Sequence, residues 1–173
     1  MNKRLKEFTI VAMIAAIYAV TSLALAPISY GPIQIRVSEA LTLLPIIYPP
    51  SILGVTLGCF ITNLVGAMTG MNILGFLDVF VGTLATFLAA VCTYKLRKIE
   101  FKGMPLLAAS MPVIFNAIFI GMELAIAYFP ATIMMGFAIN AFQVGLGELL
   151  ACFVVGLPLI NILKKTKLFT EKM

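Results

Sequence analysis

Long apolar runs alternate along the whole chain with short stretches rich in charge, proline or glycine. An apolar run of about 20 residues is long enough to cross the hydrocarbon core of a bilayer as a helix. The pattern predicts six helices, near residues 8–26, 38–48, 51–67, 75–94, 105–128 and 134–163. We therefore expect an all-α integral membrane protein, a six-transmembrane-helix bundle in which residues 1–173 form a single membrane domain.

The second of these helices is short. Residues 38–48 supply only about 16 Å of helix, and Pro45, Pro49 and Pro50 interrupt or follow the run. A helix of that length does not cross a flat bilayer alone, but it is tolerated where neighbouring helices shield it and it lines a cavity. We expect this segment to be a half-length or tilted helix inside the bundle.

Basic residues mark the ends of the predicted helices. All but Arg36 fall into three clusters: Lys3, Arg4 and Lys6; Lys95, Arg97, Lys98 and Lys102; Lys164, Lys165, Lys167 and Lys172. The positive-inside rule places each cluster on the cytoplasmic side, so an even number of crossings separates each cluster from the next. Both termini are then cytoplasmic. A nucleic-acid partner is not expected, because such an interface needs its basic residues on one contiguous face.

Composition narrows the function. Of the 173 residues, 62% are apolar and 11% charged, against about 45–50% and 25% in soluble domains, so the lipid bilayer is the expected environment. Histidine, the commonest general base and a frequent metal ligand, is absent, and the three cysteines have no C-x-x-C spacing. With no G-x-S-x-G sequence, we expect neither an enzyme nor a metal site. No G-x-x-x-x-G-K-[ST] loop is present, so we expect no cofactor in this chain and an energy source on a partner.

The acidic residues of the apolar runs gather toward the outer side. Under the predicted topology, Glu39, Asp78 and Glu123 lie near outer helix ends and Glu148 lies near the midplane, while Arg36 is the only basic residue on that side. The amides at similar depth are Gln34, Asn63, Asn72, Asn116, Asn140 and Gln143. A charge in a bilayer costs enough to need a partner or a ligand. The pattern predicts a cup, open to the outside, that takes a cationic or donor-rich ligand.

Glu148 is the sharpest candidate among these acids. It ends the segment Gly145-Leu146-Gly147-Glu148, where small residues let another group approach the backbone, and this favours ligand contact over a structural hydrogen bond. Planar ligands are held by stacking on aromatic rings. The aromatic residues near the same level are Tyr30, Phe76, Tyr128 and Phe142.

Structural alternatives stay open for the other polar residues. Arg36 and Glu39 are three residues apart and could form an ion pair that only pins the loop. Glu123 and Asp78 could reach water at the interface, and Asn116 could be a hydrogen-bonding contact between helices.

Small residues form a stripe on the first predicted helix. Its members are Ala12, Ala15, Ala16 and Ala19. A stripe of small residues is typical of close helix packing in lipid, and both docking of a partner and packing within the chain fit it. Gly54 and Gly58 form a similar pair on the third predicted helix, which we expect to pack internally.

Three segments carry most of these polar residues. They are Tyr30-Gly31-Pro32-Ile33-Gln34-Ile35-Arg36-Val37-Ser38-Glu39-Ala40-Leu41, Leu77-Asp78-Val79-Phe80-Val81-Gly82-Thr83-Leu84-Ala85-Thr86 and Gly145-Leu146-Gly147-Glu148-Leu149-Leu150. With these segments in this order, essentially the whole chain resembles the QueT family. The resemblance implies the substrate-binding (S) subunit of an energy-coupling factor (ECF) transporter in the bacterial plasma membrane. Such a subunit would have an S-component-like fold and capture a queuosine precursor such as preQ1 at its outer face.

The resemblance also implies partners and site roles. The S subunit would dock through its alanine-rich first helix onto a transmembrane coupling subunit, and two cytoplasmic ATPases would use ATP to power import. PreQ1, a 7-aminomethyl-7-deazaguanine, has an ammonium group at one end and guanine N–H donors at the other, so one carboxylate can pair with each end. Glu148 and Glu123 are the first candidates for these two pairings. The remaining expected site residues are Asp78, Asn116, Gln143, Gln34, Arg36, Glu39 and Tyr30.

The chain departs from the family at one position. Members often carry tryptophan just before the aspartate of the second segment, where this chain has Leu77 and no tryptophan anywhere. If that tryptophan stacks on the base, Phe76 or Tyr30 is expected to do so here. The alternative functions are an S subunit for another vitamin or nucleobase, and a structural membrane protein.

Overall fold

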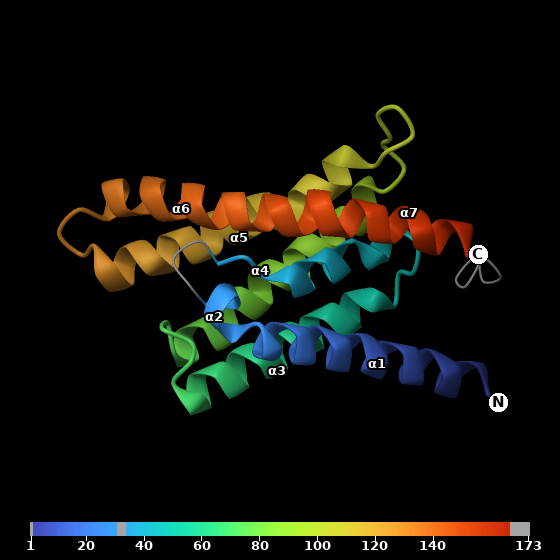
Figure 1. The fold of residues 1–173 in the computed structure, drawn as a ribbon, viewed down its shortest axis with the longest axis horizontal. Helices are drawn as coiled ribbons and strands as arrows, with labels where there is room; N and C mark the ends of the chain where they lie inside the picture. The colour runs from blue at the N-terminus through green and yellow to red at the C-terminus, as the bar shows by residue number, and fades with distance from the viewer. Residues whose placement is uncertain (1, 31–33, 167–173) are drawn as a thin grey trace.

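The computed structural model describes residues 2–30 and 34–166, which fold into a bundle of helices (Figure 1). In chain order the helices are α1 (Lys3–Ala24), α2 (Ala26–Ser29), η1 (Val37–Ile46), α3 (Ser51–Thr69), α4 (Phe76–Leu96), α5 (Leu106–Tyr128), α6 (Ile133–Leu149), η2 (Leu150–Gly156) and α7 (Leu157–Lys165). The predicted all-helical class is confirmed. Gly31, Pro32 and Ile33 of the first family segment, and Lys167 and Lys172 of the third basic cluster, lie outside the described residues.

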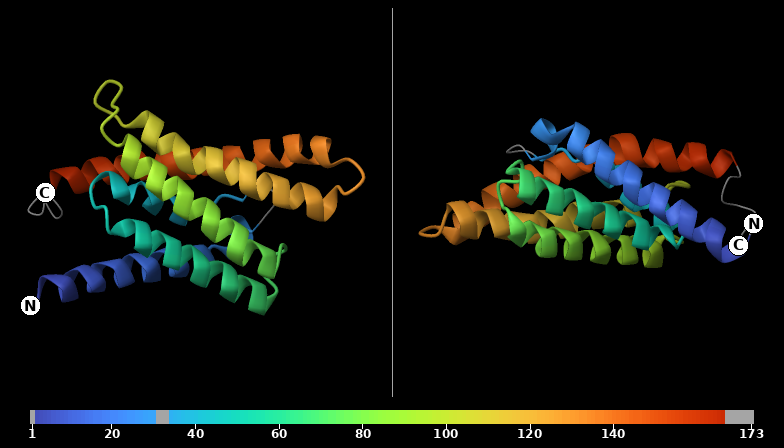
Figure 2. Two further views of the ribbon diagram at one scale, coloured as in Figure 1. Left: turned by 180° about the vertical axis from the view of Figure 1, so that it is seen from behind. Right: turned by 90° about the horizontal axis from the view of Figure 1, so that it is seen from below.

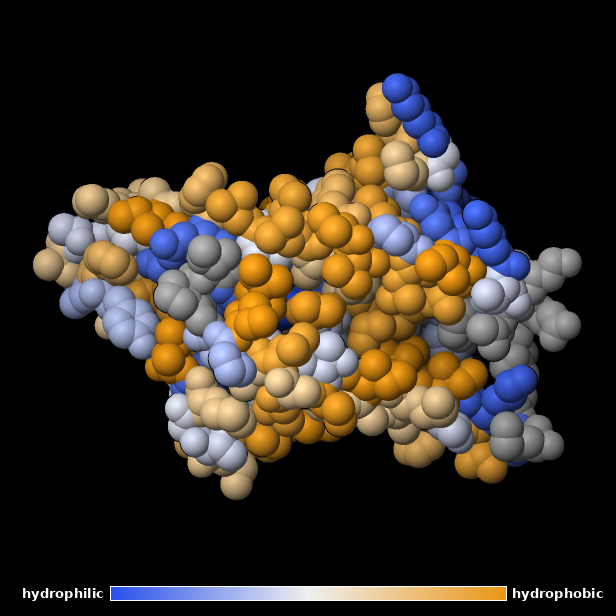
Figure 3. All heavy atoms as spheres, viewed as in Figure 1, coloured by the Kyte–Doolittle hydropathy of each residue, from blue (hydrophilic) through white to orange (hydrophobic). Residues whose placement is uncertain are grey.

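Five helical segments are long and apolar enough to cross a membrane. They are Arg4–Ala24, Ser51–Thr69, Phe76–Leu96, Leu106–Tyr128 and Ile133–Lys165. Apolar side chains cover the middle of the face drawn in Figure 3, and hydrophilic residues gather at the end that carries the α4–α5 connection and the end of α7. This distribution is that of a multi-pass membrane protein.

The predicted short second helix corresponds to η1, a 3₁₀-helix of ten residues with Pro45 inside it. Its length was predicted, but its 3₁₀ geometry was not. Eight of its ten residues are buried, and it contacts α1, α3, α4 and η2. The neighbouring helices therefore shield η1, as a segment too short to span the bilayer requires.

The last predicted helix is one long rod with a change of winding in the middle. The π-helical segment η2 joins α6 to α7, and the sequence pattern gives no sign of it because the hydrophobic run is continuous. The rod packs closely on η1 at Gly156, where an added Cβ would lie 2.8 Å from Leu43 Cδ1 and 3.3 Å from the Ala40 backbone. Gly156 is thus a packing requirement of the contact between η2 and η1.

The first and third predicted helices pack through the expected glycines. A Cβ at Gly58 would lie 2.6 Å from Tyr18 Cβ and 3.0 Å from the Ala15 carbonyl oxygen, and Gly54 meets Ile14 in the same way. The internal role predicted for this pair is confirmed. The alanine stripe is divided by this packing, because Ala15 and Ala19 are buried in the chain while Ala12 and Ala16 are exposed.

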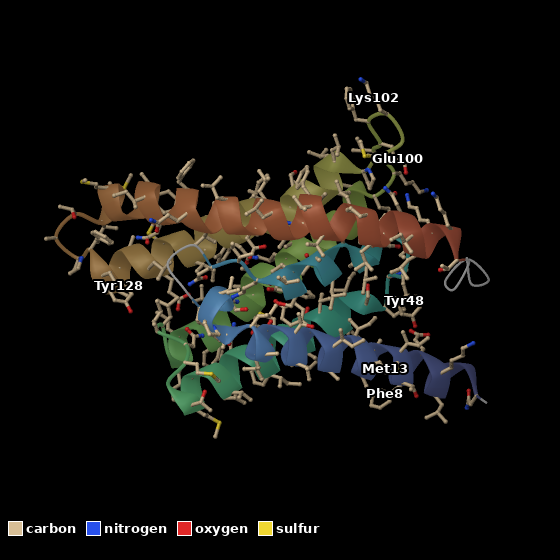
Figure 4. All side chains as sticks on the ribbon, viewed as in Figure 1. Phe8, Met13, Tyr48, Glu100, Lys102 and Tyr128 are labelled. Atoms are coloured by element: carbon tan, nitrogen blue, oxygen red, sulfur yellow. The ribbon has the colours of Figure 1, made fainter. Side chains whose placement is uncertain are left out.

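The ends of the described chain lie at the same end of the bundle (Figures 1 and 2). Glu100 and Lys102, in the α4–α5 connection, lie at that end too, whereas Tyr128 lies at the opposite end (Figure 4). Both ends of the described chain lie together because η1, which follows α1 and precedes α3 in the chain, runs back along the length of the bundle.

Candidate ligand-binding site

Four acidic side chains are buried inside the bundle. The exposed fractions are 0% for Glu39 and Asp78, 3% for Glu123 and 2% for Glu148. Among the described residues the one buried basic side chain is Arg36. The interior therefore carries a surplus of acceptors and of potential negative charge, which the low dielectric of the bundle makes expensive without partners.

Asp78 is the acid that Arg36 neutralises. Arg36 Nη2 lies 2.9 Å from Asp78 Oδ2, and Asn72 Nδ2 donates to the same oxygen at 2.7 Å. Arg36 also lies over the ring of Tyr30, 5.4 Å from its centroid. The alternative in which Arg36 pairs with Glu39 is wrong, because the folded chain brings Asp78, 42 residues away, to the guanidinium. The alternative in which Asp78 reaches water is wrong as well, since its side chain is fully enclosed.

Glu39 is held by hydroxyl groups from two other helices. Tyr18 on α1 donates a hydrogen bond to Glu39 Oε1, and Thr86 on α4 donates to the same oxygen at 3.3 Å. The second oxygen, Oε2, has no hydrogen-bond partner among the described residues. Tyr18 and Thr86 were missed by the sequence analysis. An available signal was the hydroxyl that each carries into a predicted membrane-spanning helix.

Asn116 on α5 joins Glu39 to Glu148. Its side chain lies within hydrogen-bonding reach of both carboxylates. Helices α5 and α6 pack together nearby, where an added Cβ on Gly145 would lie 3.6 Å from Ala117 Cβ. Glu148 Oε2 has no partner in the described part of the chain. Asn116 thus does connect helices, and the groups that it connects are two of the predicted site acids.

Glu123 lies two turns further along α5, toward the end of the bundle that carries Tyr128. Neither of its carboxylate oxygens has a hydrogen-bond partner among the described residues. The charges of Asp78 and Arg36 act on it, so Glu123 belongs to the same electrostatic cluster. The alternative in which it reaches water is wrong, because the side chain is buried.

A cavity of about 310 Å³ opens at this end of the bundle. Its lining residues are Tyr30, Ile73, Leu124, Tyr128, Phe129, Asn140 and Gln143. Tyr30 is fixed by donating its hydroxyl proton to the Thr62 carbonyl at 3.0 Å. Gln34 is buried too.

The aromatic candidates separate in the structure. Tyr30 and Tyr128 line the cavity, whereas Phe76 and Phe142 are 60% and 67% exposed on the outside of the bundle. The expectation that Phe76 or Phe142 covers a ligand ring is therefore wrong, because the faces of α4 and α6 that carry them point away from the interior. Phe129, which was not predicted, joins the cavity lining.

The fold is that of a multi-pass membrane protein, and its interior holds four buried acidic side chains. The sequence model of the family described as QueT transporter matches residues 8–165, and the chain belongs to this family. The family is one of transporters. The resemblance given by the three segments is confirmed.

A curated relative carries the same family name. Over 88 residues the chain is 39% identical to the "Queuosine precursor transporter QueT" of Lactococcus lactis subsp. cremoris (strain MG1363). The aligned region covers 49% of this chain and 48% of the relative, so the match spans about half the length of that protein. No solved structure matches the chain.

Proposed function

We propose that this protein is the substrate-binding subunit of an ECF-type importer and captures a preQ1-like 7-deazaguanine at its outer face. The observation that carries the proposal is a set of buried carboxylate oxygens that receive no hydrogen bond from any described residue. They are Glu39 Oε2, Asp78 Oδ1, Glu123 Oε1, Glu123 Oε2 and Glu148 Oε2. Buried acceptors need hydrogen-bond donors, and a cationic, donor-rich ligand supplies them.

PreQ1 has this chemistry. Its ammonium group carries three donors and no acceptor, and the guanine edge presents the N1–H and amino donors that a carboxylate accepts in a fork. The cavity of about 310 Å³ beside Tyr30 and Tyr128 is at the lower end of the range for small-molecule sites. Its lining includes Asn140 and Gln143 but none of the four buried acids, which lie deeper in the bundle. The names of the family and of its relative, both QueT, agree with this ligand class.

The orientation follows from charge. The basic clusters near both termini and in the α4–α5 connection share one end of the bundle, and the positive-inside rule makes that end cytoplasmic. The chain then crosses the membrane six times with η1 counted as one passage, and the cavity opens outward.

The energy for uptake comes from partners in this proposal. A transmembrane coupling subunit docks on the exposed face of α1 that carries Ala12 and Ala16, and two cytoplasmic ATPases use ATP. Ala15 and Ala19 support this face from inside. Small residues there permit close approach of a partner helix.

Calorimetry on the detergent-purified chain tests the ligand. PreQ1, preQ0 and guanine are titrated, with thiamine and riboflavin as controls. Tight binding of preQ1 is the expected result. Binding of a control vitamin alone would keep the S-subunit role and discard the ligand, and no binding to any compound would leave a structural membrane protein as the better description.

A further inference from the structure

The buried acids are not equivalent as partners for a cation. The ion pairs among the described residues join Arg36 to Asp78 and Lys164 to Glu100. Asp78 is thus already neutralised, and Glu123 is a single carboxylate, neither of whose oxygens has a hydrogen-bond partner among the described residues. Glu39 and Glu148 form the remaining pair. They come from η1 and α6, and both lie within hydrogen-bonding reach of Asn116.

We propose that Glu39 and Glu148 together form the subsite for the ammonium group of the ligand, while Glu123 receives the donors of the ring. This assignment rests on the proposed function and adds the orientation of the ligand to it. Within residues 2–30 and 34–166, each carboxylate of the pair keeps one oxygen without a donor. Two acceptors from separate elements suit an ammonium group, which carries three N–H donors and a full positive charge.

The hydroxyl groups around Glu39 act as positioning residues. Tyr18 and Thr86 both donate to Oε1, so the rotation of the carboxylate is fixed and Oε2 is the oxygen left for a ligand. The fixed geometry reduces the conformational entropy that binding would otherwise cost. A ligand with a neutral, donor-free substituent gains nothing from this arrangement.

The spacing along α5 fits a ligand with donors at both ends. Asn116 and Glu123 are seven residues apart, which is about 10.5 Å along a helix. Apolar side chains lie between these levels, where Ile120 and Val144 belong to one buried cluster. A planar ring between two polar ends therefore meets apolar neighbours, and its orientation is fixed by which end carries the ammonium.

The test compares two ligands that differ at that end. PreQ1 carries the aminomethyl ammonium and preQ0 a neutral nitrile in its place. Dissociation constants are measured by calorimetry for the wild-type chain, Glu148→Gln, Glu39→Gln and Glu123→Gln. Glu100→Gln is the matched control, because Glu100 is an exposed acid in the α4–α5 connection.

The two classes of variant are expected to differ. Glu148→Gln and Glu39→Gln are expected to weaken the binding of preQ1 by about 10- to 100-fold, the range for losing a charged hydrogen bond. The affinity for preQ0 stays nearly unchanged, so the preference for preQ1 over preQ0 is lost. Glu123→Gln weakens both ligands to a similar extent and preserves the preference. The control variant behaves as the wild type.

Three outcomes would overturn the assignment. If Glu123→Gln loses the preference for preQ1 over preQ0 and both pair variants keep it, the ligand has the opposite orientation. If every variant keeps this preference, the proposed ammonium subsite does not exist. If the pair variants are not monodisperse in detergent, 7-methyl-7-deazaguanine, which lacks the ammonium group, is titrated into the wild-type chain instead. If this compound binds as tightly as preQ1, recognition of the ammonium group is rejected. Failure of the wild-type chain to bind preQ1 and preQ0 alike counts against the proposed function itself, which separates the two failures.

Discussion

The ion pair between Arg36 and Asp78 gives a quantitative prediction for Asp78→Asn. The substitution keeps the volume and removes the charge, which leaves a guanidinium that is only 4% exposed without its ion-pair partner. Removing one partner of a buried pair costs about 3–5 kcal/mol. The amide oxygen of asparagine still accepts a hydrogen bond from Arg36, which lies 2.9 Å from the carboxylate in the native chain, so we expect the lower end, about 3 kcal/mol.

A double-mutant cycle isolates the pair. Arg36→Met in the Asp78→Asn background removes the stranded charge, and the double variant is expected to lose less than the sum of the single losses, since apolar replacement of a whole buried pair is often neutral. The assay is unfolding in mixed micelles followed by circular dichroism, because the chain has no tryptophan for fluorescence. A loss below about 1 kcal/mol for Asp78→Asn, or additive losses in the double variant, would refute the reasoning.

Three further predictions concern packing, docking and positioning. Gly58→Ala places a methyl group 2.6 Å from Tyr18 Cβ, and we expect overpacking to cost about 1–3 kcal/mol of stability in thermal unfolding. Gly145→Ala, where the nearest atom is 3.6 Å away, is expected to be tolerated, so equal losses of stability in the two variants would contradict the packing argument. Ala16→Leu, on the exposed face of α1, is expected to abolish co-purification with a coupling subunit and to spare ligand binding. Ala15→Leu changes a residue buried in the chain and is expected mainly to lower the thermal midpoint. The reverse pattern would reject this docking face. Tyr18→Phe removes a donor to Glu39 and is expected to weaken preQ1 by about tenfold in calorimetry, with unchanged affinity counting against a positioning role.

The helices were predictable because each is a long apolar run with clear ends. The run at residues 51–67 became Ser51–Thr69, and the shortness of residues 38–48 was visible from its prolines. The 3₁₀ winding of η1 and the π winding of η2 could not be predicted from the sequence, because 3₁₀-, α- and π-helices use the same apolar residues and differ in contacts that packing decides.

The acids were predicted to lie within the membrane-spanning bundle, but the partners of these side chains were missed. Burial of the acids followed from their place in apolar runs, but Arg36 finds Asp78 across 42 residues, and no local spacing encodes such a contact. The outward direction of the Phe76 and Phe142 side chains was missed for a related reason. Phe76 and Phe142 stand in helices that are apolar on all sides, so periodicity does not tell an inward ring from an outward one.

The enclosure of η1 has a consequence for the lipid around the protein. Mismatch between a helix and the thickness of the hydrocarbon layer acts on surfaces that touch lipid, and η1 is surrounded by protein with eight of its ten residues buried. The five long apolar segments therefore take up changes in bilayer thickness by tilting, and the segment that carries Glu39 is insulated from them. Ligand affinity measured in short-chain and long-chain lipid vesicles should accordingly vary less than the thermal midpoint of the whole bundle.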